Sequence, residues 1–399
     1  MLRSGHELTT CRQADTSLKF PDREDLRATG RHEASDSSRR ACSSQLVERG
    51  SVTRLILPVL VTLILALTPP AHAEFVRGIY TFSASTYDTI VSLGFNMVVS
   101  GPAWETELVK ARQLGLKVIP SWYGDDTTAY DLMRSLDTDP MIMAWYPFDE
   151  PDIYHYSKEV VRDKIAILRR NNLKKPVYLT VFSPLHYSTY LPSADIFGIT
   201  PYPIGSNPER INMDIVGRYT RRARILAPDK PLLVCIPAFF QRPWQYRSPD
   251  PEELHNIVYQ ALTGYPDGVI FFIWQVQSMD GEIWNLDQHP DLLEEMGVIN
   301  SELIELDEVL TKGEPVPDAT VSPHTVYQRV SSHRNAQYWI MANPYADPVT
   351  ATLALPGKVT HARIMFGRRA ELGDAPDSRT IAVNLGALGY ATVRIEAGR

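Results

Sequence analysis

Residues 142–183 decide the fold and read IMAWYPF (142–148), DEPDIYH (149–155), YSKEVVRDKIAILRRN (156–171), NLKKP (172–176) and VYLTVFS (177–183). The first and last segments are short apolar runs with the length of a β-strand. Between them, apolar side chains recur at the spacing of one helix face, namely Val160, Val161, Ile165 and Leu168. The stretch therefore predicts two parallel strands joined by a helical crossover.

The same alternation extends in both directions along the chain. The apolar runs are residues 76–82, 96–101, 117–123, 142–148, 177–183, 195–202, 232–239 and 269–275. They are nearly continuous, which is typical of parallel strands buried on both faces. Helical spacing recurs at 209–226 and 252–263, and Asp250-Pro251 is a typical helix start. Eight such units in about 230 residues predict a (β/α)8 TIM barrel. The alternative is a doubly wound open sheet, but no GxGxxG follows the first run.

The sequence changes character after residue 310. Residues 313–320 are rich in Gly and Pro and are predicted to be a linker. Short strands with turn residues between them follow at 337–342, 350–355, 361–366, 380–384 and 391–396. We therefore expect a barrel over residues 74–312 and a small C-terminal antiparallel β-sandwich domain over 321–399.

The N-terminal region resembles an export signal. Arg54 precedes the apolar run 55–67, and Ala71-His72-Ala73 has the small-x-small pattern of a cleavage site. Residues 51–73 are thus predicted to be a signal peptide, and residues 1–50 a disordered extension or a start codon assigned too far upstream. The alternative is an uncleaved anchor. Cleavage predicts a secreted or periplasmic protein with no stable membrane span.

Composition excludes several classes of protein. The net charge of −7 argues against a nucleic-acid partner, which would require a basic surface. Of the 3 Cys, only Cys235 follows residue 73, so no internal disulfide is expected. The His residues do not pair at metal-ligand spacing, and neither a P-loop nor HExxH is present. We therefore expect no cofactor and no required metal. The oligomeric state is left open.

In such a barrel, chemistry takes place at the C-terminal ends of the strands. The fourth run ends in Asp149-Glu150-Pro151. Two adjacent carboxylates beside an apolar wall repel each other, which raises the pKa of one and provides a general acid near neutral pH. The alternative is that Asp149 caps the next segment and Glu150 pairs with an arginine.

These residues carry a resemblance to a known group. Residues 145–151 resemble the fourth-strand signature of clan A glycoside hydrolases, and more closely the Asp-Glu-Pro form in uncharacterised barrels related to that clan. Trp274, at the end of the eighth run, resembles the clan's sugar-platform Trp. The resemblance implies a glycosidase acting on an oligo- or polysaccharide. Glu150 would be its proton donor, and Asp149 would replace the Asn that binds the sugar 2-hydroxyl.

The sequence departs from clan A at the seventh strand, where the clan places its nucleophilic Glu. Residues 232–241 contain no carboxylate. Retaining and inverting enzymes both need a second carboxyl group across the scissile bond. Candidates on loops at the strand ends are Glu105, Asp125, Asp126, Asp280 and Glu282. Each is individually more typical of a solvated loop charge.

Two further hypotheses avoid this difficulty. Hexosaminidase barrels of families 20 and 123 resemble this chain in an adjacent Asp-Glu pair after strand four. There the substrate's own N-acetyl group is the nucleophile, which implies that Asp149 orients it and Glu150 donates the proton. Alternatively, the barrel binds carbohydrate without cleaving it. Candidate sugar-binding residues at the strand ends are Trp104, Trp122, Tyr123, Tyr202, Trp244, Trp274 and Gln275.

Overall fold

The structure is a computed structural model. It describes residues 74–101, 104–122, 127–205, 207, 211–241, 246–277, 281, 283–316 and 318–397. The predicted N-terminal extension and signal peptide, residues 1–73, lie outside these ranges. Within them, no helix is both long and apolar enough to cross a lipid bilayer.

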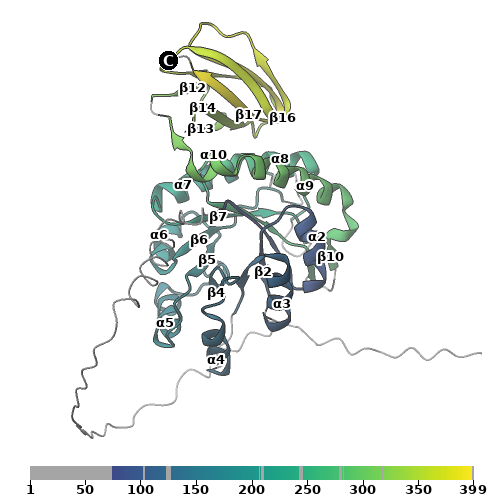
Figure 1. The fold of residues 1–399 in the computed structure, drawn as a ribbon, viewed down its shortest axis with the longest axis vertical. Helices are drawn as coiled ribbons and strands as arrows, with labels where there is room; N and C mark the ends of the chain where they lie inside the picture. Colours follow the sequence, from purple (N-terminus) through teal and green to yellow (C-terminus); the bar gives the residue numbers. More distant parts are fainter. Residues whose placement is uncertain are drawn as a thin grey trace, which may run out of the picture. The chain divides into compact units, whose positions relative to one another are not determined.

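Eight parallel strands form the barrel that the sequence predicts (Figure 1). They are β1 (Val76–Tyr80), β2 (Met97–Ser100), β3 (Lys117–Pro120), β4 (Trp145–Phe148), β5 (Val177–Val181), β6 (Ile196–Ile199), β7 (Leu232–Pro237) and β8 (Gly268–Phe272). The sheet order runs from β3 through β2, β1 and β8 down to β4. Isolated bridges from Val118 to Ile142 and from Ser121 to Tyr146 join β3 to β4 and close the barrel.

Helical segments follow the strands and cover the outside of the sheet. They are η2 (Ala84–Thr86), α2 (Tyr87–Ser92), α3 (Trp104–Leu114), α4 (Thr127–Leu136), α5 (Lys158–Arg170), α6 (Tyr187–Tyr190), η3 (Leu191–Ser193), α7 (Ile215–Leu226), α8 (Pro251–Leu262), η5 (Leu286–Gln288), α9 (Pro290–Glu305) and α10 (Asp307–Lys312). The apolar faces of amphipathic helices outside and packed side chains inside bury both faces of each strand. This burial explains the nearly continuous apolar runs.

The start of α8 follows from its sequence. The Asp250 carboxylate accepts the Glu253 N–H at 2.8 Å, and the Glu253 carboxylate accepts the Asp250 N–H at 2.9 Å. This capping box satisfies two of the backbone donors that a helix N-terminus leaves unpaired. Pro251 occupies the first helical position, where its missing N–H costs nothing.

The C-terminal region forms one antiparallel seven-stranded sheet. Its strands are β11 (Glu314–Pro315), β12 (Thr320–Ser322), β13 (Tyr327–His333), β14 (Ala336–Ala342), β15 (Val349–Ala354), β16 (Val359–Gly373) and β17 (Thr380–Ala397). One half of β17 pairs with β15 and the other half with β14, while β16 runs along its opposite edge. Trp339 of β14 and Leu353 of β15 share one apolar core. The sheet therefore folds over its own core, and the predicted barrel with a C-terminal β domain is confirmed.

Helix α8 belongs to both parts of the fold, since its residues from Glu253 to Leu262 are all buried. The barrel covers one side, and β14 and β17 pack on another. The polar side chains of α8 are satisfied across this junction: Asn256 Nδ2 donates to the carbonyls of Asn343 at 3.0 Å and Leu388 at 2.9 Å. His255 lies between Glu295 and Glu302, and the Tyr390 ring stacks on it at 4.0 Å.

A short hairpin follows the eighth strand. Strands β9 (Gln275–Gln277) and β10 (Ile283–Asn285) pair in antiparallel register. Trp274 immediately precedes β9, and its backbone N–H donates to the Tyr80 carbonyl at 2.9 Å. The hairpin thus begins at the C-terminal end of the barrel.

Candidate active site

Asp149 and Glu150 leave β4 at the C-terminal end of the barrel, as the sequence predicts. The Glu150 backbone has a φ of 39°, in the left-handed region. A residue that precedes a proline favours extended conformations, so this geometry is disfavoured for Glu150. Left-handed backbone of this kind costs about 1–3 kcal/mol and persists where the surroundings impose it, often at functional sites.

Asp149 is held by two hydroxyl groups. Tyr146 Oη donates to its Oδ1 at 2.5 Å, and Thr180 Oγ1 donates to the same oxygen at 2.9 Å. Tyr146 belongs to β4 and Thr180 to β5, so adjacent barrel strands fix the carboxylate. Burial raises the pKa of Asp149, and these two hydrogen bonds oppose that rise.

The Glu150 carboxyl group lacks the hydroxyl donors that hold Asp149. Its backbone N–H donates to Thr180 Oγ1 at 3.1 Å, but its Oε1 is buried and has no hydrogen-bond partner among the described residues. Burial raises the pKa of Glu150 well above its ordinary value, and the charge of Asp149 raises it further. The hydroxyl of Thr200, just beyond β6, is close enough to oppose this rise. The buried Glu150 carboxyl, beside a fixed anion, therefore holds its proton more tightly than an ordinary glutamate.

Asp152 fixes the loop that carries the pair. Its carboxylate accepts the N–H of Ser183 at 2.7 Å and that of Phe182 at 3.2 Å, both just after β5. His186 Nδ1 lies 3.5 Å from the same carboxylate. The Asp152 side chain therefore connects the segment after β4 to the end of β5.

Aromatic and thiol groups surround the acid pair. Tyr80, Tyr178, Tyr202 and Cys235 are buried, their pKa values are raised chiefly by burial, and in each the Asp149 charge adds to the rise. Burial also raises the pKa of Tyr154, and the Asp149 and Glu150 charges add to it, so this phenol lies near both acids. Tyr154 is 45% exposed.

Among the predicted sugar-binding residues, Tyr202 lies near the acids: burial raises its pKa, and the charges of Glu150 and Asp149 raise it further. Its ring contacts Phe239 at 5.3 Å and Tyr246 at 5.5 Å, and its hydroxyl lies 3.7 Å from Cys235 Sγ. Trp122 is 6% exposed, with Tyr130 against its edge and the Lys164 ammonium 5.1 Å from its ring centre. That both of these residues bind sugar stays a prediction.

Trp274 and Gln275 have contrasting environments. Trp274 is 1% exposed, and its Nε1 donates to Asp287 Oδ2 at 3.3 Å. Its ring belongs to the barrel core. Gln275 is exposed on β9. The structure thus gives Trp274 a packing role, and its role as a sugar platform stays a prediction.

Other predicted residues lie outside the described part of the chain. They are Tyr123, Asp125, Asp126, Trp244, Asp280 and Glu282, together with the side chains of Trp104 and Glu105. The second carboxyl group that a two-acid mechanism needs is therefore not located. In the described ranges, no group of three or more His, Cys, Asp or Glu side chains could hold a metal ion.

Sequence reasoning assigned no role to Tyr146, Thr180 and Tyr178, because it looked for site residues where each strand ends, and it gave none to Thr200 although this residue follows β6. Tyr146 and Thr180 lie inside strands whose apolar character concealed them. Tyr178 and Thr180 are two positions apart, and the alternation of a strand places both on the same side of β5. That periodicity was the available signal.

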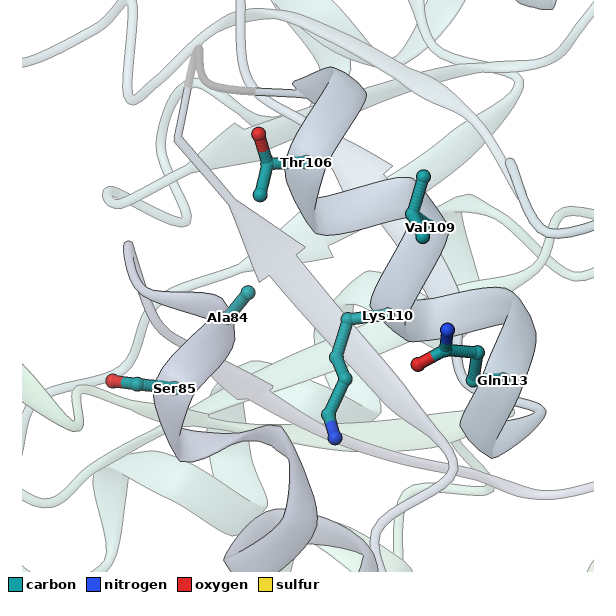
Figure 2. Close-up of a pocket in the computed structure, with 6 residues that line it drawn as sticks. All are labelled: Ala84, Ser85, Thr106, Val109, Lys110 and Gln113. Atoms are coloured by element: carbon teal, nitrogen blue, oxygen red, sulfur yellow. The ribbon is translucent and has the colours of Figure 1, made fainter.

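An open depression of about 580 Å³ lies on the outer surface (Figure 2). Its lining comes from η2 and α3: Ala84, Ser85, Thr106, Val109, Lys110 and Gln113. The Lys110 ammonium pairs with Asp88 at 2.7 Å. This lining contains no carboxylate, so the depression does not provide the acid chemistry of the β4 end.

No protein-family model matches the sequence, and no curated protein matches it. Solved structures share the fold. Amy13B from Eubacterium rectale aligns at a TM-score of 0.54 and 9% identity over 84% of this chain and 98% of its own. An α-amylase from Geobacillus thermoleovorans, complexed with acarbose, aligns at 0.53 and 11% over 82% and 99%. A maltogenic α-amylase from Thermotoga neapolitana aligns at 0.50 and 10% over 80% and 98%. The predicted resemblance to glycoside hydrolase barrels is thus confirmed for the fold.

Proposed function

We propose that this chain hydrolyses glycosidic bonds with Glu150 as the proton donor. One observation carries the proposal: a buried Glu150 carboxyl, without a described partner at Oε1, stands beside a hydrogen-bonded Asp149 where β4 ends. Environments that push two carboxyl groups apart in pKa are typical of acid catalysts in glycosidases. The fold shared with amylases supports the choice of substrate class.

In this reaction Glu150 gives its proton to the glycosidic oxygen while the bond to the anomeric carbon breaks. The bonding electron pair goes to the departing oxygen, and the positive charge that develops on the sugar is stabilised by the Asp149 carboxylate. Water then adds its hydroxyl to the anomeric carbon, and its proton restores Glu150. General acid catalysis of this kind contributes about 10²–10⁴ in rate.

The second candidate is a substrate-assisted mechanism on N-acetylated sugars. It is favoured by the absence of any carboxylate in residues 232–241, which form β7 and its end. A fixed Asp149 would then orient the acetamido group, whose oxygen attacks the anomeric carbon. The chain itself would supply no nucleophile.

The test is Glu150→Gln, which keeps the shape of the side chain but has no proton to donate. We expect cleavage of glycosides with poor leaving groups to fall by about 10²–10⁴, and cleavage of activated aryl glycosides to fall far less. Glu159→Gln on the exposed first turn of α5 is the matched control and should match wild type. Wild-type rates on natural glycans with Glu150→Gln would contradict the proposal.

Asp149→Asn distinguishes the two mechanisms. A clan A type of site tolerates an amide at this position, whereas the substrate-assisted mechanism needs its charge and should lose activity on N-acetylated sugars. If the wild-type protein binds glycans from a broad panel but cleaves none, the non-catalytic alternative replaces both. We also propose that residues 51–73 direct export of the chain.

A further inference from the structure

Three oxygen atoms meet at the base of the acid pair: Tyr146 Oη, Thr180 Oγ1 and Asp149 Oδ1. Tyr146 lies 2.5 Å and Thr180 2.9 Å from Asp149, and the two hydroxyl oxygens are 2.7 Å apart. Thr180 and Tyr146 are both completely buried. Bulk water therefore does not satisfy these groups.

The directions of these hydrogen bonds follow from the available protons. A backbone N–H can only donate, so Glu150 gives its amide proton to Thr180 at 3.1 Å. Tyr80 Oη donates to Tyr146 Oη at 3.4 Å. Both contacts bring a proton into the group of three oxygens from outside. The hydroxyl protons of Tyr146 and Thr180 are thereby left to point inward, and a carboxylate is their strongest acceptor.

The Glu150 carboxyl differs from Asp149 in its hydrogen bonds. Its Oε1 is buried but receives no hydrogen bond from the residues described. A carboxylate without donors is poorly stabilised in such a site, whereas a protonated carboxyl is not. The protein thus stabilises charge on Asp149 with two hydroxyl donors, whereas the Thr200 hydroxyl only partly opposes the rise in the pKa of Glu150.

We infer that Tyr146 and Thr180 are positioning residues: their hydroxyl groups hold Asp149 as a fixed carboxylate, so that the proton of the acid pair resides on Glu150. This inference rests on the proposed function for its effect on rate, but the location of the proton can be measured separately.

Other titratable groups face the pair from every side. They are Tyr80 on β1, Asp152 and Tyr154 after β4, Tyr178 on β5, Tyr202 after β6 and Cys235 on β7. Burial raises the pKa values of Tyr80, Tyr178, Tyr202 and Cys235, so these groups stay neutral where the acids titrate. Asp152 adds negative charge and favours protonation of both acids. Tyr146 and Thr180 are therefore the groups whose hydrogen bonds distinguish Asp149 from Glu150.

Removal of either hydroxyl should bring the pKa values of Asp149 and Glu150 closer together. In Tyr146→Phe and Thr180→Val the Asp149 anion loses a donor, so its pKa rises. With less charge on Asp149, the pKa of Glu150 falls. The two limbs of the pH–rate profile should therefore move toward each other, and kcat should fall about 10–100-fold. Thr180→Ser keeps the hydroxyl and should restore the wild-type profile.

Tyr187→Phe is the matched control, because the Tyr187 hydroxyl is buried on α6 and has no described hydrogen-bond partner. It should leave the profile unchanged. An infrared titration follows the carboxylic acid band directly and does not depend on activity. Near neutral pH the band should be weaker in Glu150→Gln than in wild type and retained in Asp149→Asn, because the Glu107 carboxyl contributes equally to all three.

The outcomes separate the two proposals. If Glu150→Gln cleaves natural glycans at the wild-type rate, the proposed function fails whatever the infrared titration shows. Suppose instead that Glu150→Gln loses activity, but that Tyr146→Phe and Thr180→Val fold and keep the wild-type pH–rate profile and the wild-type carboxylic acid band. The positioning role alone is then refuted. If Thr180→Val does not fold, Tyr146→Phe still decides the question.

Discussion

Gly198 on β6 offers a test of the acid site that changes neither acid nor their hydrogen-bond partners. A Cβ added at this position would lie 2.8 Å from Thr180 Cγ2 and 2.8 Å from both Cε2 and Oη of Tyr178. Ordinary van der Waals contact begins near 3.4 Å. Gly198→Ala must therefore displace one or both of these side chains by about 0.6 Å.

That displacement should affect both the stability of the protein and its turnover number. Overpacking of a core in this way costs about 1–3 kcal/mol in free energy of unfolding. A 0.6 Å shift of Thr180 is also enough to lengthen its 2.9 Å contact with Asp149 Oδ1 toward 3.5 Å, beyond the range of a good O–H···O bond. We therefore expect Gly198→Ala to lower both the melting temperature and kcat, the latter by about 10–100-fold.

The assay combines thermal unfolding with turnover of an aryl glycoside, measured well below the melting temperature so that only folded protein contributes. Gly297→Ala on α9 is the matched control, because its Cβ meets Leu93 Cδ2 at 3.3 Å and no other atom is recorded within 4 Å. Alanine is favoured over glycine inside a helix by about 1 kcal/mol, so this control should be neutral or stabilised. Unchanged stability and turnover in Gly198→Ala would refute the close packing of Tyr178 and Thr180 described above.

Three further predictions follow from other parts of the chain. Trp274→Ala should cost about 3–5 kcal/mol of stability, because the indole is buried in the barrel core; a binding titration that instead shows weaker glycan binding at unchanged melting temperature would favour the sugar platform. Burial raises the pKa of Glu107 from 4.5 to about 7, so the folded state holds this proton more tightly than the unfolded chain, and stability should fall as pH rises between those values. Denaturant titrations across that range should show a smaller fall in Glu107→Gln, and equal slopes would contradict this. N-terminal sequencing of exported protein should begin at Glu74, and an exported chain that starts at Met1 would exclude cleavage after Ala73.

The barrel could be predicted from the sequence because its signals are local. Each of the eight apolar runs overlaps a strand of the barrel, since a strand buried on both faces needs an unbroken apolar segment. The start of α8 was equally visible, because Asp250 and Pro251 act through adjacent backbone groups. Asp149 and Glu150 were identified because they end a strand.

Interactions between distant segments could not be predicted in this way. Strand β17 was predicted as two strands, because Gly386 and Gly389 resemble a turn, whereas the structure continues one strand through them. The hydroxyls of Tyr146 and Thr180 come from separate strands, and neither residue indicates its partner in the sequence. The stacking of Tyr390 on His255 likewise joins residues 135 positions apart.

Because α8 is buried on two sides, its packing depends on the order in which segments of the chain emerge during synthesis. The ribosome releases α8 long before β17, whose residues supply partners for the buried polar groups of that helix. Until about residue 390 has emerged, Asn256 lacks the Leu388 carbonyl and His255 lacks the Tyr390 hydroxyl, so the side of α8 that later packs on β14 and β17 stays hydrated. Contacts of such long sequence separation slow folding, because the loop entropy is lost before they form. We therefore expect a gene product truncated at residue 312 to be a poorly folded barrel and a client for chaperones, rather than a smaller enzyme.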